Sequence, residues 1–231
     1  MRVRADPCVG QIAEWIAAQG RDLMPAFDQA ERFLQILDPG SESFSFRTFS
    51  DTPYTRLPGR DPLERALHGP LISCWPDLVT LNQRGAAISV TINRTNGLGR
   101  TPNDIVQVRA LFLDDDNPPP NLDRFPVPPH IQVQTSPGRY HHYWLVEDLP
   151  RSRFSRLQNR LAQHYRGDNK IMALNQSMQL PGFWRRKNLN RPLLPTIYRF
   201  DDHKPYSEVY LENRLVFEYD KATQDAASIL E

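Results

Sequence analysis

Proline interrupts this chain so often that a fold built on long, continuous helices is excluded. The 231 residues include 21 prolines, about 9% of the chain where roughly 5% is usual. Each proline fixes one backbone angle and removes one N–H donor, so it favours turns and the first turn of a helix. Pro118-Pro119-Pro120 in particular can form neither a helix nor an inner strand. We therefore expect short helices and strands joined by many turns.

The composition indicates a soluble, folded, cytoplasmic protein. Hydrophobic residues make up 39% of the chain and charged residues 24%, which is typical of globular domains. No segment approaches the roughly 18 uninterrupted apolar residues of a membrane helix, and the first ten residues lack the apolar segment of a secretory signal. Cys8 and Cys74 form no CxxC pair, so the sequence predicts reduced thiols and no zinc site.

Positive charge is concentrated in one part of the chain. The net charge is +1, yet residues 139–191 contain 11 Lys or Arg and only 3 Asp or Glu, a balance of +8. The remainder must then carry −7. A basic segment can attract a polyanion such as nucleic acid. A well-solvated helix face followed by a basic loop would have the same composition, so this feature alone does not decide between the two.

Hydrophobic periodicity predicts an α+β fold with a largely antiparallel sheet. Apolar residues at helical spacing, bounded by Pro and Gly, predict helices over residues 11–19, 25–37, 76–83, 151–166 and 219–230. Asp61-Pro62 is expected to begin a further helix. Alternating or apolar runs predict strands over residues 42–49, 87–93, 105–113, 131–134, 140–146 and 196–200.

Three consecutive acids end the apolar strand predicted at 105–113. Alternate side chains of a strand share a face, so Asp114 and Asp116 project together, with their Cα atoms roughly 6.6 Å apart, while Asp115 faces the other way. Two carboxylates this close repel unless a cation lies between them, and oxygen ligands on one face suit Mg²⁺ or Mn²⁺. A solvated acidic end of a strand is the alternative.

The segment SPGRYHHYW predicts a hairpin with polar groups at its turn. Proline followed by glycine suits a type II turn between the strands 131–134 and 140–146. Ser136 and Arg139 then lie at the turn, and His141 lies early on the returning strand. A hydroxyl, exposed backbone N–H groups and a cation together suit a phosphate chain. His141 and His142 cannot share a sheet face, so they are not a paired metal site.

Further candidates follow on the basic side of the chain. Asp168 lies just after Gly167, which should end the helix 151–166. The run LPGFWRRK places aromatic residues beside Arg185, Arg186 and Lys187, a mixture that suits nucleotides and equally an ordinary loop anchor. We also count Arg100, Arg109 and Lys187 as candidate nucleotide-binding residues; Arg109 interrupts an apolar strand, where a cation is costly unless it is paired or faces a site.

These motifs, in this order, resemble the archaeo-eukaryotic primase superfamily, and most closely its RepB-like plasmid and phage primases. The superfamily pattern is an apolar strand ending in DxD, a serine- and histidine-bearing hairpin and a third acid; here these are LFLDDD, SPGRYH and Asp168. LPGF and the approach NRTNGLGR resemble the RepB-like group, although Gln179 stands where a basic residue would precede LPGF. The resemblance covers about residues 78–192.

The resemblance implies a DNA primase-polymerase that makes primers on a single-stranded DNA template. Asp114, Asp116 and Asp168 would bind two catalytic Mg²⁺ or Mn²⁺ ions, and Ser136, Arg139 and His141 would hold the triphosphate of an incoming NTP or dNTP. It also implies an RRM-like sheet with helices behind it, and possible cooperation with a replicative helicase or a C-terminal accessory domain. No membrane partner is expected.

Two other functions use the same residues, and both stay open at the level of sequence. A metal-dependent nuclease would use the same acids, and a non-catalytic DNA-binding replication module would leave them facing solvent. A rolling-circle relaxase is disfavoured, because HHY lacks a histidine–apolar–histidine arrangement. We expect one bilobed catalytic domain over 1–231, composed of an N-terminal α/β layer (1–84), a motif-bearing sheet (85–200) and a helical tail (201–231).

Overall fold

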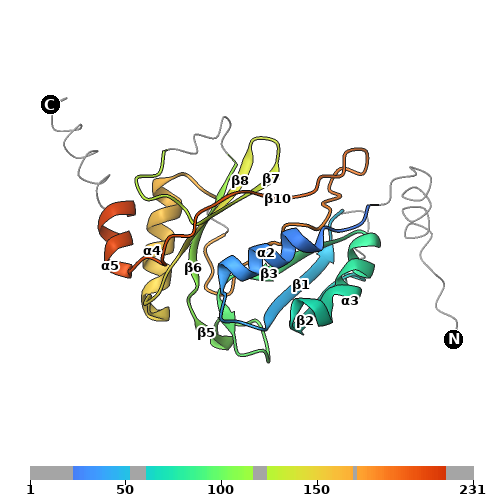
Figure 1. Ribbon diagram of the computed structural model, residues 1–231, viewed down its shortest axis with the longest axis horizontal. Helices are drawn as coiled ribbons and strands as arrows, with labels where there is room; N and C mark the ends of the chain where they lie inside the picture. Colours follow the sequence, from blue (N-terminus) through green and yellow to red (C-terminus); the bar gives the residue numbers. More distant parts are fainter. Residues whose placement is uncertain (1–22, 53–60, 117–123, 169–170, 217–231) are drawn as a thin grey trace, which may run out of the picture.

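The computed structural model describes residues 23–52, 61–116, 124–168 and 171–216. They form two four-stranded antiparallel sheets with helices packed against them, which confirms the predicted α+β class (Figure 1). The helices expected at 11–19 and 219–230 lie outside the described residues. None of the described helices is both long and apolar enough to cross a membrane.

The first sheet has the strand order β2-β1-β3-β9. Its strands are β1 (Phe44–Ser50), β2 (Arg65–Gly69), β3 (Ala86–Thr91) and β9 (Ser177–Gln179). In β1, Phe44 and Phe46 are buried in the core, so Arg47 and Phe49 point to the opposite face.

The second sheet has the strand order β10-β7-β8-β6. Its strands are β6 (Ala110–Asp115), β7 (Ile131–Ser136), β8 (Arg139–Leu145) and β10 (Thr196–Phe200). β7 and β8 form the predicted hairpin, and Gly138 at its turn has a φ of 77°, as a type II turn requires. A small two-stranded sheet of β4 (Arg94–Thr95) and β5 (Ile105–Gln107) follows β3, with the short helix η2 (Pro102–Asp104) between its strands.

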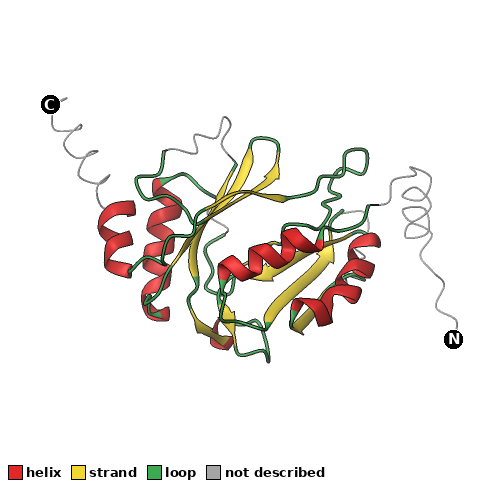
Figure 2. Ribbon diagram, viewed as in Figure 1, coloured by secondary structure: helices red, strands yellow, loops and turns green. Residues whose placement is uncertain are grey.

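One core joins the two sheets, and helices complete it. The helices are α2 (Phe27–Leu37), α3 (Leu71–Gln83), α4 (Arg151–His164), α5 (Glu208–Leu211) and η3 (Glu212–Val216). Helices α2 and α3 pack beside the first sheet, and α4 and α5 lie beyond the second (Figure 1 and Figure 2). The ring of Phe33 meets Tyr143 of the second sheet at 5.3 Å between centroids, and Phe27 meets Trp75 at 4.9 Å.

Two predicted helix starts were wrong. Asp61 begins no helix: its carboxylate instead accepts hydrogen bonds from the Ser50 amide at 2.7 Å and from the Leu63 amide at 2.9 Å, which fastens a turn to the end of β1. The helix expected from Pro76 begins at Leu71 and contains that proline. Its buried stripe continues on both sides of Pro76, through Leu71, Cys74, Leu78 and Leu81, and this burial outweighs the one lost backbone hydrogen bond.

The strand expected over 105–113 is two strands in two sheets. β5 pairs with β4, and β6 pairs with β8. The chain changes sheets at Val108 and Arg109, where the Arg109 amide donates to Asn93 Oδ1 at 2.9 Å. The side chain of Asn93 therefore replaces a ladder partner at the crossing.

Candidate active site

A cavity of about 300 Å³ lies between the two sheets. The first sheet contributes one wall, from β1, β3 and β9, and the second sheet contributes the other, from β6, β7 and β8. The segment after α4 and the segment after Gly182 complete it. The charged and titratable residues that line the cavity are Asp51, Asp114, Asp116, Arg139, His141, Asp168, Arg185 and Lys187.

The three predicted acids meet in this cavity. Asp114 in β6 and Asp116 just after it both line the cavity, as strand alternation predicts. Asp168 arrives from the end of α4, and its amide donates to the Asp114 carbonyl at 3.3 Å. Gly167 permits this close approach, because a Cβ there would lie 2.3 Å from Leu113 Cδ1. Asp115 points away, where Arg124 binds its carboxylate at 2.9 Å.

The surroundings of Asp114 disfavour the charged form of its carboxyl group. Burial, and after it the charges of Asp116 and Asp168, raises the pKa of the Asp114 carboxyl to about 6. The cations Arg185 and Arg139 act in the opposite direction. A carboxyl whose charged form is disfavoured by its neighbours gains most from a bound cation.

The hairpin adds donors to the acids. Arg139 Nη1 lies 2.9 Å from Asp116 Oδ2, and His141 Nε2 lies 3.6 Å from Asp114 Oδ1. Burial, then the charges of Arg185 and His142, lowers the pKa of His141 to about 3. The imidazole is therefore neutral at pH 7, with its Nδ1 3.3 Å from the hydroxyl of Tyr143.

Some predicted residues do not reach the cavity. Among the described residues, its lining includes Lys187 but not Ser136, Arg100 or Arg109. Arg109 is held elsewhere, because its Nε donates to Asp38 Oδ2 at 2.6 Å and its guanidinium lies over the ring of Phe44. We therefore assign no nucleotide contact to Arg109.

The neighbours of Ser136 and Arg100 do reach the cavity. Ser136 lies in the hairpin turn, and the adjacent Thr135 is the residue that lines the cavity. Arg100 Nη1 donates to Ser177 Oγ at 3.2 Å, and Ser177 lines the cavity. Both predicted residues therefore lie one contact away from it.

A family comparison identifies the chain. Residues 82–223 match the model of the RepB DNA-primase N-terminal domain. The chain belongs to the RepB-like primases of the archaeo-eukaryotic primase superfamily. This stretch contains every residue named above as a candidate ligand of metal or phosphate, which agrees with the family resemblance found in the sequence.

Solved structures confirm the primase fold. The archaeo-eukaryotic primase domain of the cyanophage S-2L primase-polymerase superimposes with a TM-score of 0.67 at 18% identity, covering 83% of this chain and 99% of that one. The catalytic domain of the primase RepB′ in complex with initiator DNA gives a TM-score of 0.56 at 19% identity, covering 88% and 98%. A search of curated proteins found no match.

Sequence reasoning about this primase missed most of the opposite wall. The first sheet and the residues just after its strands line the cavity with Asp51, Ser89 and Gln179. Arg185 also lines it, and its positive charge acts to lower the pKa of Asp114. Arg185 had a signal, since it stands in the basic run after LPGF. Asp51 had a weaker one, an acid at the end of a predicted strand. For Ser89 the sequence carries no signal, because its position depends on which strands pair.

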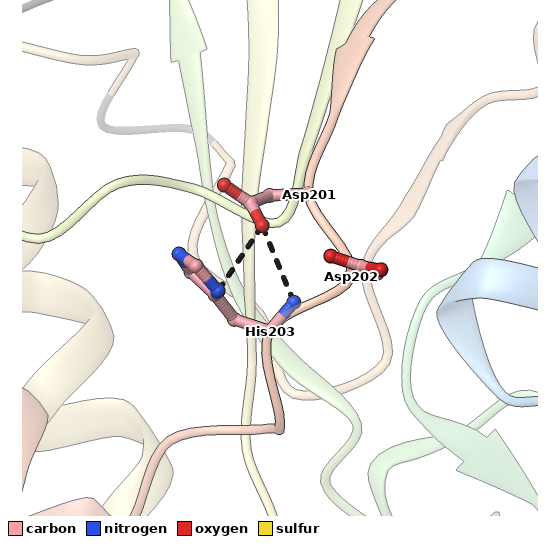
Figure 3. A group of neighbouring side chains, drawn as sticks. All are labelled: Asp201, Asp202 and His203. Carbon is pink, nitrogen blue, oxygen red and sulfur yellow. Dashed lines mark hydrogen bonds and ion pairs between the residues drawn. The ribbon is translucent and has the colours of Figure 1, made fainter.

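A second acidic group in this primase lies outside the cavity. Asp201, Asp202 and His203 are, among the described residues, the one group of three whose ligand atoms lie within 4.8 Å of one another (Figure 3). Asp201 Oδ1 already accepts from the His203 amide at 3.3 Å and lies 3.2 Å from its Nδ1. These consecutive residues follow β10 and do not line the cavity, so we assign them no metal.

Proposed function

We propose that this primase synthesises primers on single-stranded DNA by metal-assisted nucleotidyl transfer. The observation that carries the proposal is the convergence of Asp114, Asp116 and Asp168 with Arg139, His141 and Lys187 in one cavity between the sheets. Acids for a cation on one side and donors for phosphates on the other are the two requirements of the reaction.

The donor set of the cavity fits a hard divalent cation such as Mg²⁺ or Mn²⁺. The oxygens of the three acids are not all within 4.8 Å of one another. Mg²⁺ does not require that, because it usually takes one or two protein carboxylates and completes its shell with water and substrate phosphates. Asp114 and Asp116 would hold the cations and Asp168 would complete the set. A pair of cations held there would lower the pKa of the attacking 3′-hydroxyl and offset the charge of the leaving pyrophosphate.

The chain's own cations would orient the triphosphate. Arg139 at the hairpin turn and Arg185 and Lys187 from the opposite segment present positive charge to the same space as the acids. His141 is neutral, so it keeps a single ring N–H, which would donate a hydrogen bond to a phosphate oxygen. Positioning of this kind supplies much of the catalysis of phosphoryl transfer.

The open face of the first sheet would hold the template. Phe49 of β1 lines the cavity, and Arg47, on the same face of the strand, lies over its ring. Arg100 reaches Ser177 from the loop after β4. The charge of Arg47 contributes to the lowered pKa of Arg100, behind burial, so the two cations lie close together. An aromatic ring beside cations suits single-stranded DNA, and a RepB′ primase structure contains initiator DNA.

A primer-synthesis assay tests the proposal and separates it from the alternatives. The protein is incubated with a single-stranded template, Mn²⁺ or Mg²⁺, and labelled NTPs or dNTPs. We expect extended products from the wild type and a loss of at least about 100-fold with Asp114→Asn and Asp116→Asn. Unchanged synthesis by that variant would remove the proposal.

The same preparation distinguishes the other candidates. A nuclease would shorten labelled DNA without nucleotides, whereas a non-catalytic binding module would bind DNA and show no metal-dependent binding of nucleotides by calorimetry. For the template, Arg47→Ala with Arg100→Ala should weaken DNA binding and flatten its salt dependence. Arg65→Ala is the control, since Arg65 pairs in register with Thr48 on the other face of the sheet. A helicase or accessory domain as further partner stays a prediction.

A further inference from the structure

The buried Arg186 stands in the chain between two basic residues that line the cavity. Arg185 and Lys187 line the cavity, whereas Arg186 between them is only 1% exposed. In an extended segment alternate side chains project to the same side, so the inward turn of Arg186 directs its two neighbours outward to the nucleotide site. The orientation of the pair therefore depends on what holds Arg186 and its backbone.

Asn82 holds the start of this segment. It lies at the end of α3, is fully buried, and its side-chain amide makes two hydrogen bonds to Trp184: Nδ2 donates to the carbonyl at 2.8 Å and Oδ1 accepts from the amide at 3.2 Å. The same Nδ2 donates to the Ala86 carbonyl at 2.8 Å. The side chain of Asn82 therefore bonds both the backbone N–H and the backbone carbonyl of Trp184, as a neighbouring strand would.

Contacts with three further residues fix the rest of the segment. Arg185 exchanges backbone hydrogen bonds with Leu193 at 2.7 and 3.0 Å. The Arg186 amide donates to Asp51 Oδ2, and Arg186 Nη1 donates to the Gln83 carbonyl at 2.7 Å. The Asp51 carboxylate also offsets the buried guanidinium charge, which is costly to isolate. The backbone from Trp184 to Arg186 is thus held at each residue.

We infer that Asn82 and Arg186 are positioning residues that aim Arg185 and Lys187 at the triphosphate of the incoming nucleotide. The inference rests on the proposed function. Long cationic side chains lose much rotamer freedom when they bind phosphate, and a backbone that is already fixed reduces that loss. Neither Asn82 nor Arg186 lines the cavity, so each would act through its neighbours.

A double-mutant cycle tests the inference. ATP affinity in the presence of Mn²⁺ is measured by calorimetry for Asn82→Ala, for Arg185→Ala with Lys187→Ala, and for the triple variant. Asn82→Ala alone should weaken ATP binding about tenfold or more and raise the KM for ATP while kcat changes little. In the background of Arg185→Ala with Lys187→Ala, the Asn82→Ala change should have almost no further effect on ATP affinity, because the two side chains that Asn82 positions are gone.

Controls separate positioning from general damage. Thr80→Ala changes an exposed side chain on the same helix and should leave ATP binding unchanged. Arg186→Met keeps an unbranched side chain, removes the contact with Gln83, and should follow the same cycle; it decides the question if Asn82→Ala does not fold. The inference would be overturned if the substitution reduced ATP affinity equally with and without Arg185 and Lys187, or did not reduce it at all. A wild-type protein that neither binds ATP nor makes primers would instead overturn the proposed function.

Discussion

Asp114 and His141 face each other across β6 and β8, with Oδ1 and Nε2 3.6 Å apart. They are partners in register, yet at pH 7 they do not form an ion pair. Burial lowers the pKa of His141 to about 3, so the ring is neutral. Burial and neighbouring acids raise the pKa of Asp114 to about 6, so this carboxylate is charged and lacks a full counter-charge. A cation bound at the proposed metal site would supply that counter-charge.

The pKa of Asp114 predicts that Asp114→Asn stabilises the metal-free protein at neutral pH. Its folded pKa of about 6 lies above the ordinary value of 3.8, so between these values the folded state holds a proton that the unfolded state has lost. Stability therefore falls as pH rises from 4 to 6, and the cost, about 2–3 kcal/mol, persists above pH 6.

Thermal unfolding in EDTA checks this sign. The variant should melt higher than the wild type at pH 8 and close to it at pH 4. Mg²⁺ should narrow the difference at pH 8, because a ligand that binds the folded state stabilises the wild type. An equal difference at both pH values would contradict the assignment.

His141→Ala should act on nucleotide binding more than on turnover. A hydrogen bond to a charged phosphate contributes about 1.5–3 kcal/mol, so its loss should raise the KM for the nucleotide about tenfold or more. Steady-state primer synthesis at varied nucleotide concentration measures both constants. His203→Ala, an exposed histidine outside the cavity, should change neither, and an unchanged KM for His141→Ala would remove its role.

Local chemistry in the sequence predicted one wall of the site. The acids at the end of β6, the glycine turn and the histidine on β8 are set by strand alternation and turn preference, which act over a few residues. The convergence of these groups follows once β6 and β8 are neighbours.

The other wall depends on pairing between distant segments. β3 lies between β1 and β9, and no local pattern fixes that order, so Ser89 and Asp51 were not foreseen as lining residues. Arg109 shows the same limit. A cation in an apolar strand must be paired or face a site, and only the packing of α2 against the sheet reveals that Asp38 is its partner.

Gly182 should be the least replaceable glycine among those described. Its φ is +87°, and a Cβ there would lie 2.3 Å from the Ala26 carbonyl oxygen. Gly182→Ala combines left-handed strain with a backbone clash and should cost about 3 kcal/mol or more. Gly85→Ala, with a φ of +98° and open space, should cost about 1–2 kcal/mol. Urea unfolding compares the two; equal costs would show that the clash relaxes freely.

Arg139→Ala should change metal binding and nucleotide binding in opposite directions. In the free protein Arg139 Nη1 lies 2.9 Å from Asp116 Oδ2, with both side chains about half exposed. A cation that binds Asp116 must displace this guanidinium, so its removal should tighten Mn²⁺ binding without nucleotide by a few-fold, in keeping with an exposed ion pair. The same guanidinium then becomes free to bind the triphosphate, so its removal should weaken ATP binding about tenfold.

Titrations of Mn²⁺ alone and of ATP with Mn²⁺ measure the two effects of Arg139→Ala. Arg153→Ala is the control, because the partners of Arg153 are Glu208 and Glu212. Changes of the same sign in both titrations would mean that Arg139 does not exchange one acidic partner for the other.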